Sequence, residues 1–146
     1  MTRVVLKKLT KGELMQPDWI LNIKQITVHP IAMPLVSPFE TSFGTQTLRG
    51  IVLVRVETAG GAVGWGEVTT DFDPGYSYET SQTAIHILND YLVPRLMQVQ
   101  PLHSDKRWVW LESVRGHPLA KHGLISAILT AAAAELQMSL AEMLTI

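Results

Sequence analysis

Cysteine is absent from the 146 residues of the chain. Its absence excludes disulfides, thiolate metal sites, iron–sulfur clusters and a cysteine nucleophile together. A surplus of basic residues is also lacking, because 12 Lys and Arg stand against 13 Asp and Glu, for a net charge of −1. Without a basic stripe, we expect no nucleic-acid partner.

Long apolar runs are missing as well. The stretch Gly123–Ala134 is uncharged for about twelve residues, whereas a membrane span needs ~20. The N-terminus carries no apolar core of the kind that marks a signal peptide. These absences predict a cytoplasmic protein with no membrane partner, since reducing compartments are the default for chains without cysteine.

The composition that remains is that of one globular domain. Hydrophobic residues make up 47% of the chain and charged residues 17%, against about 25% charged in typical soluble domains. Residues 1–21 show no sustained periodicity, so we interpret them as an N-terminal extension. Residues 22–146 then form the folded domain.

The first half of this domain predicts three strands. Apolar residues alternate with polar ones around Ile26 and Val28, which is typical of a half-buried strand, and the nearby prolines favour a sheet edge. The run Ile51–Glu57 is the clearest strand, and Ala59–Gly61 predicts a hairpin turn into a third strand over 62–67. The sequence therefore predicts an antiparallel meander.

The second half has helical periodicity. Ser77 is a candidate N-cap for the first helix, and Pro94 is expected to end or kink it. Ser104-Asp105 predicts a short helix, Pro118 opens a longer one, and Ser139–Glu142 forms a capping box for the last. The expected fold class is α+β, with a three-stranded antiparallel meander followed by a three- to four-helix bundle.

Two connections are long enough to draw attention. Residues 34–49 form a turn-rich segment that we predict to be a loop, and residues 69–78 form a second irregular loop. Long ordered loops are often functional.

Patterns of catalytic or metal-binding residues are otherwise weak. The five histidines show no metal-ligand spacing, and Asp71 and Asp73 are interpreted as turn residues because a calcium loop would need a further acidic ligand. The glycine-rich Gly61–Gly66 stretch lies in a strand and opens no helix, so it does not predict a phosphate site. We assign no catalytic residue and no metal ligand to this chain.

Several segments together resemble a known family. They are Pro34-Leu-Val-Ser-Pro-Phe-Glu-Thr-Ser-Phe-Gly-Thr45, Val52-Leu-Val-Arg-Val-Glu57, Gly64-Trp-Gly-Glu67, Pro74 with Tyr76, and Arg115-Gly-His-Pro-Leu-Ala-Lys121. In this order they resemble the N-terminal domain of the enolase superfamily, within the mandelate racemase and muconate lactonizing enzyme-like group. The resemblance is strongest to the o-succinylbenzoate synthase and N-acylamino acid racemase enzymes.

The resemblance implies a capping domain without its C-terminal (β/α) barrel. In full-length relatives the barrel holds Mg²⁺ and removes a proton α to a carboxylate. The reactions are a lyase dehydration to o-succinylbenzoate in menaquinone biosynthesis and an isomerase reaction, the racemisation of N-acylated amino acids. No cofactor is therefore expected in this chain, and a small carboxylate substrate is expected only if a barrel is supplied.

The resemblance also implies which residues contact substrate. The first candidate loop corresponds to residues 38–45 and the second to residues 69–76. An alternative interpretation places the two phenylalanines of the first loop in the domain's own core. The implied substrate-binding residues are Phe39, Thr41, Ser42, Phe43, Gly44, Thr70, Asp71 and Tyr76.

Two functions remain open at this point. The first is a truncated or stand-alone capping domain that determines substrate specificity and is inactive alone. The second is a non-catalytic interaction module that forms a homo-oligomer or pairs with a separate barrel chain. Its contact surface would be an exposed apolar helix face formed by Leu124, Ile128 and Leu129 with the neighbouring alanines.

Overall fold

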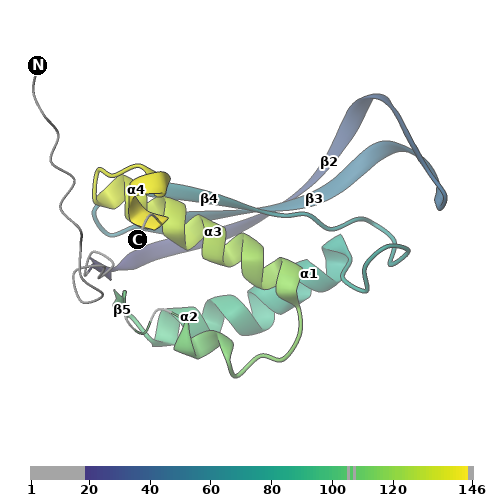
Figure 1. The fold of residues 1–146 in the computed structure, drawn as a ribbon. Coiled ribbons are helices and arrows are strands. Elements are labelled where there is room, and N and C mark those ends of the chain that lie inside the picture. The colour runs from purple at the N-terminus through teal and green to yellow at the C-terminus, as the bar shows by residue number, and fades with distance from the viewer. Residues whose placement is uncertain (1–18, 105, 107, 145–146) are drawn as a thin grey trace, which may run out of the picture.

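The computed structural model describes residues 19–104, 106 and 108–144, and it confirms the α+β class. A three-stranded antiparallel sheet is followed by helices (Figure 1). The elements in chain order are β1 (Ile20–Leu21), β2 (Ile23–Thr41), β3 (Gly44–Thr58), β4 (Val63–Val68), α1 (Ser81–Ile87), the π-helical turn η1 (Leu88–Leu92), α2 (Val93–Gln98), β5 (Leu102–His103), the 3₁₀ turn η2 (Val109–Leu111), α3 (Pro118–Glu135) and α4 (Leu140–Leu144).

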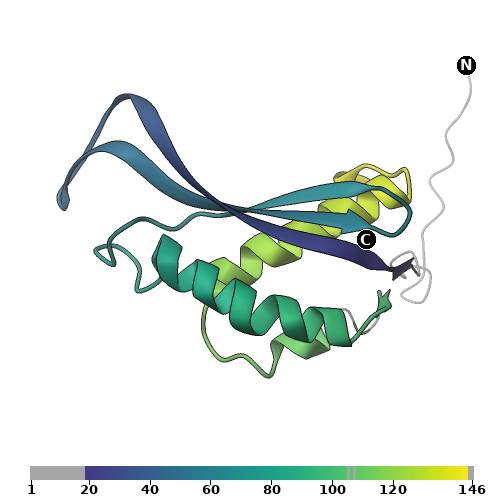
Figure 2. The same cartoon turned by 180° about the vertical axis from the view of Figure 1, so that it is seen from behind.

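The sheet has the order β2-β3-β4, so β3 is central and β2 lies at an edge. Val52, Val54 and Val56 of β3 have no exposed surface, as the alternation over 51–57 predicted. Helices α1 and α3 contact β3, and the helices cover one side of the sheet (Figures 1 and 2). The hydrophobic core lies between these two layers.

The predicted loop over residues 34–49 is wrong. Strand β2 continues to Thr41 and pairs with β3 from Gly44 onward, so this segment is the outer half of a long β-hairpin. Within this segment the ladder is interrupted between Pro34 and Phe39. The edge position predicted from the prolines of this strand is confirmed. An edge strand with one neighbour tolerates a missing N–H donor, so the strand continues where the turn-forming residues predicted a loop.

Glycines allow helix α3 to pack directly on strand β4. A Cβ at Gly64 would lie 2.1 Å from the backbone nitrogen of Ala131, and one at Gly66 would lie 1.9 Å from the Gly123 carbonyl oxygen. The Thr130 hydroxyl of α3 also accepts a hydrogen bond from the Trp65 N–H at 2.9 Å. The Gly-Trp-Gly stretch therefore serves backbone-to-backbone packing.

Burial of α3 corrects the predicted interaction face. Leu124 and Ile128 have no exposed surface, and Ala127, Ala131 and Ala132 are equally buried. Of the proposed set, Leu129 is partly exposed and Ala134, at the end of the alanine run, is exposed. The domain's own sheet covers this face, because a helix of small residues fits closely against β4.

The folded part also begins earlier than predicted. Trp19 is 4% and Leu21 is 2% exposed, and both belong to the core. Strand β1 pairs with β5 through Leu21 and Leu102. These residues of the predicted extension are therefore part of the domain, and residues 1–18 lie outside the described residues.

The start of α1 differs from the expected one. Thr80, not Ser77, is the N-cap, and it forms a capping box with Thr83. Pro94 does not end the helical run, since it stands in the first turn of α2, directly after η1. The π-helical turn η1 interrupts the α-helical pattern directly before this proline, and prolines and π-helical turns are both causes of helix kinks.

Of the remaining helix predictions, two are confirmed and one is not. Pro118 opens α3 and Ser139 with Glu142 caps α4, as predicted. The helix expected after Ser104-Asp105 is only the short turn η2, and Asp105 lies outside the described residues. In the described part of the chain, no helix is long and apolar enough to cross a membrane.

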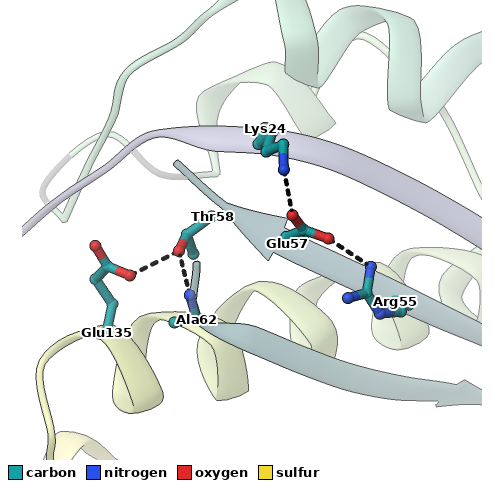
Figure 3. Close-up of polar contacts among 6 residues, drawn as sticks. All are labelled: Lys24, Arg55, Glu57, Thr58, Ala62 and Glu135. Atoms are coloured by element: carbon teal, nitrogen blue, oxygen red, sulfur yellow. Dashed lines mark hydrogen bonds and ion pairs between the residues drawn. The ribbon is translucent and has the colours of Figure 1, made fainter. Parts of the chain in front are cut away.

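Polar contacts hold the end of β3 that is distant from the hairpin tip (Figure 3). Glu57 accepts from the Lys24 ammonium at 2.7 Å and from the Arg55 guanidinium at 3.0 Å. The buried Thr58 hydroxyl donates to Glu135 at 2.6 Å and accepts from the Ala62 N–H at 2.9 Å. The two Thr58 bonds close the turn between β3 and β4 and connect this turn to the end of α3.

Candidate functional site

The tip of the β2–β3 hairpin is the first candidate loop. The Thr41 hydroxyl accepts from the Phe43 N–H and donates to the Gly44 carbonyl, each at 3.2 Å. The backbone of Gly44 has a φ angle of 133°, in the positive-φ region that favours glycine. Thr41 and Gly44 therefore form the turn that presents Ser42 and Phe43.

The phenylalanines of the hairpin point away from the core. Phe39 is 53% and Phe43 is 73% exposed. The alternative interpretation, in which they fill the core, is therefore wrong. Val36 and Leu48, which the sequence analysis did not select, add further exposed apolar surface to the hairpin.

The second candidate loop connects β4 to α1. Its aromatic side chains are exposed, at 49% for Phe72 and 92% for Tyr76. Thr70, in contrast, is buried, and its hydroxyl lies 3.1 Å from the Ser81 hydroxyl at the start of α1. The Tyr76 side chain is therefore open to solvent, whereas Thr70 holds the loop on α1.

A buried carboxylate fixes the far end of the second loop. Glu79 is 1% exposed, and its two carboxylate oxygens accept the N–H groups of Leu119 and Ala120 at 2.8 and 3.0 Å. These N–H groups belong to the first turn of α3, where negative charge is favoured. No local pattern predicts this contact, because its partners lie 40 and 41 residues away.

The two loops meet at one end of the molecule, beyond the helices (Figures 1 and 2). The Gln46 side-chain amide of β3 donates a hydrogen bond to the Asp71 carboxylate of the second loop. Phe72 packs on Gly50 of β3, where an added Cβ would lie 2.6 Å from the ring. The structure thus brings the predicted segments together through Gln46 and Phe72, which the sequence analysis missed.

The described residues of this end form no cluster of metal ligands. Among residues 19–104, 106 and 108–144, no group of three or more His, Asp or Glu is placed to hold a metal ion. A cavity of about 300 Å³ lies near β5, at the other end of the domain, and is lined by Val99, Pro101, Leu102, His103, Lys106, Val109 and Trp110. The loop end is an exposed surface with several aromatic side chains.

Comparison with known families decides where this domain belongs. Residues 23–145 match the mandelate racemase / muconate lactonizing enzyme N-terminal domain family. The chain belongs to this family. Its exposed loop end is thus that of an enolase-superfamily N-terminal domain, as the motifs predicted.

Two named relatives are similar to this chain in sequence. The chain is 39% identical over 111 residues to an N-succinylamino acid racemase from Amycolatopsis sp, covering 76% of this chain and 30% of that protein. It is 33% identical over 125 residues to the o-succinylbenzoate synthase of Bacillus subtilis, covering 86% and 34%. The chain spans about a third of the length of these relatives.

Solved structures give the same fold. An enolase-superfamily member from Enterococcus faecalis superposes with a TM-score of 0.77 at 29% identity, covering 88% of this chain and 35% of that one. An enolase-superfamily member from Listeria innocua gives 0.78 at 26% identity, covering 86% and 34%. The sheet and helices of this chain are therefore those of the superfamily's N-terminal domain.

Proposed function

We propose that residues 19–144 act as a capping domain that closes an enolase-superfamily active site over a small carboxylate substrate. The observation that carries this proposal is the meeting of the hairpin tip and the second loop at one end, with Phe39, Phe43 and Tyr76 exposed there. Aromatic side chains at a loop end expel water when a pocket forms beneath them.

The proposed partner is a (β/α) barrel, in the same polypeptide or in a separate chain. Barrel enzymes place their catalytic groups at the carboxyl ends of the strands, where a cap can cover them. Self-association through the apolar face of α3 is not proposed, because Leu124 and Ile128 are buried in the domain.

The proposed chemistry is proton removal α to a carboxylate, leading to o-succinylbenzoate or to racemised N-acylamino acids. The names of the relatives support both reactions. Mg²⁺ would supply a Lewis acid for such a reaction, but its ligands are expected outside the described residues. The cap's part is to select the substrate side chain through Phe39, Ser42, Phe43 and Tyr76 and to exclude water.

A domain exchange tests the proposal. Residues 19–144 replace the corresponding domain of the Amycolatopsis racemase, and the fusion is assayed with Mg²⁺ for racemisation of N-succinylamino acids and for formation of o-succinylbenzoate. We expect turnover of at least one substrate by the fusion and none by the chain alone. A folded fusion that turns over neither, beside an active parent enzyme, contradicts the proposal.

A further inference from the structure

The hydrogen bond from Gln46 to Asp71 joins two segments that are 25 residues apart in sequence. Gln46 stands on β3 opposite Phe39 of β2, so it belongs to the ladder of the hairpin tip. Both bonded side chains are partly buried. A bond to a charged acceptor in such a position contributes more than one between exposed neutral groups.

Asp71 is itself held firmly within the second loop. Its other carboxylate oxygen accepts the Phe72 N–H at 2.8 Å, and its backbone carbonyl accepts the Ser81 N–H at 2.9 Å. A parallel bridge also pairs it with Thr80, the N-cap of α1. The carboxylate is therefore presented to the hairpin from a frame fixed on α1.

A second contact lies beside the first. The ring of Phe72 occupies the space that a side chain at position 50 would fill, since an added Cβ at Gly50 would lie 2.6–2.8 Å from three ring atoms. Gly50 is buried in the hairpin and pairs with Ala32 of β2. The second loop thus touches the hairpin through one polar and one apolar contact on consecutive residues.

We propose that the Gln46–Asp71 bond, with Phe72 on Gly50, couples the hairpin tip and the second loop into one moving unit. Asp71 is then a positioning residue that sets the distance between Phe43 and Tyr76, and its carboxylate is engaged by the protein itself. The coupling stands on geometry alone, and its use in closing over a substrate rests on the proposed function.

The test measures the separation of the two loops by spin labelling, which the absence of native cysteine makes simple. Labels are attached to the full chain carrying Glu40→Cys and Asp73→Cys, two exposed positions on the hairpin and the second loop. Gln46→Met removes the donor while keeping the length of the side chain. We expect the population with a short distance between the labels, relative to the population with a long distance, to fall about tenfold. This is the effect of losing a hydrogen bond to a charged group.

Two comparisons decide the outcome. Gln25→Met, at an exposed glutamine of β2, is expected to leave the distance distribution unchanged. With Asp71→Ala already present, Gln46→Met is expected to have no further effect, because its partner is gone. An unchanged distribution in the single variant, or an equal change with and without Asp71, overturns the coupling.

This experiment requires neither substrate nor barrel. A negative result therefore rejects the coupling and leaves the proposed function standing. An inactive domain exchange, conversely, rejects the proposed function and leaves the coupling intact.

Discussion

Among the charged residues that the structure describes, Glu79 is the buried one, at 1% exposure. Its carboxylate meets two backbone N–H groups at the start of α3, and the first turn of that helix contains no acidic residue of its own. The side chain therefore supplies the negative charge that the helix start favours. It also joins the second loop to a helix that begins 39 residues later.

Replacing Glu79 by glutamine is expected to destabilise the domain by about 2 kcal/mol, as for loss of a buried charge-assisted hydrogen bond. The amide places a donor against an N–H that needs an acceptor. Urea unfolding measures the change. Glu112→Gln, at an exposed glutamate, is the control, and equal effects of the two substitutions would contradict the assigned role.

Glu57 makes the stability depend on pH. The hydrogen bond from Lys24, followed by that from Arg55, lowers the pKa of this carboxyl below its usual value of 4.5 (Figure 3). A lowered pKa in the folded state means that the stabilisation is present above the unfolded pKa. It is lost as the pH falls through the folded pKa.

The free energy of unfolding is therefore expected to fall less steeply below about pH 5 in Glu57→Gln than in the native chain. Urea unfolding at a series of pH values from neutral to acid measures this difference. Glu67→Gln, an exposed glutamate on β4, serves for comparison. Parallel pH profiles for the native chain and the Glu57 variant would show that the ion pairs contribute nothing.

At the scale of elements, the contact between β4 and α3 depends on glycine residues, which have no side chain. A methyl group at Gly66 would lie 1.9 Å from the Gly123 oxygen and 2.7 Å from the Ala127 nitrogen. Both are backbone atoms, so relief requires the helix to move away from the strand. The close contact of α3 with the sheet also buries Leu124 and Ile128.

Gly66→Ala is accordingly expected to destabilise the domain by about 3 kcal/mol or more, through overpacking against a backbone. Gly75→Ala is the matched control, because nothing lies within 4 Å of a Cβ added there. Thermal unfolding followed by circular dichroism compares them. A Gly66 variant as stable as the control would refute the close packing.

The same elements show how far the sequence predicts the fold. Alternation over 51–57 identified β3, and Pro118 and the Ser139–Glu142 box identified two helix starts, because these signals are local. The loop predicted over residues 34–49 was wrong because turn-forming residues are a local signal, whereas the pairing of β2 with β3 depends on contacts across the hairpin. The exposure predicted for Leu124 and Ile128 was wrong, because their burial depends on how closely β4 approaches α3.

At the scale of the whole molecule, the loop end shows what local patterns leave out. Resemblance selected Phe39, Phe43 and Tyr76, and the structure places all three on exposed surface. Gln46 and Glu79 were missed because each acts on a partner brought near only by the fold. Their positions follow from strand register and helix packing rather than from neighbouring residues.

In the proposed function, the loop end selects the substrate. Hairpin and second loop lie together beyond the helices, as Figure 1 shows, while the ion pairs of Glu57 lie at the other end of β3. An end with exposed aromatic side chains fits the proposed role as a cap.

The most direct measurement of this claim is kcat/KM of the domain-exchange enzyme with and without the Phe43 side chain. Tyr91→Ala, an exposed aromatic residue on η1, is the control. We predict that Phe43→Ala lowers kcat/KM about tenfold, the effect of losing burial of an aromatic side chain against the substrate, while Tyr91→Ala leaves it unchanged. Equal kcat/KM values for the Phe43 variant and its parent would contradict the capping role.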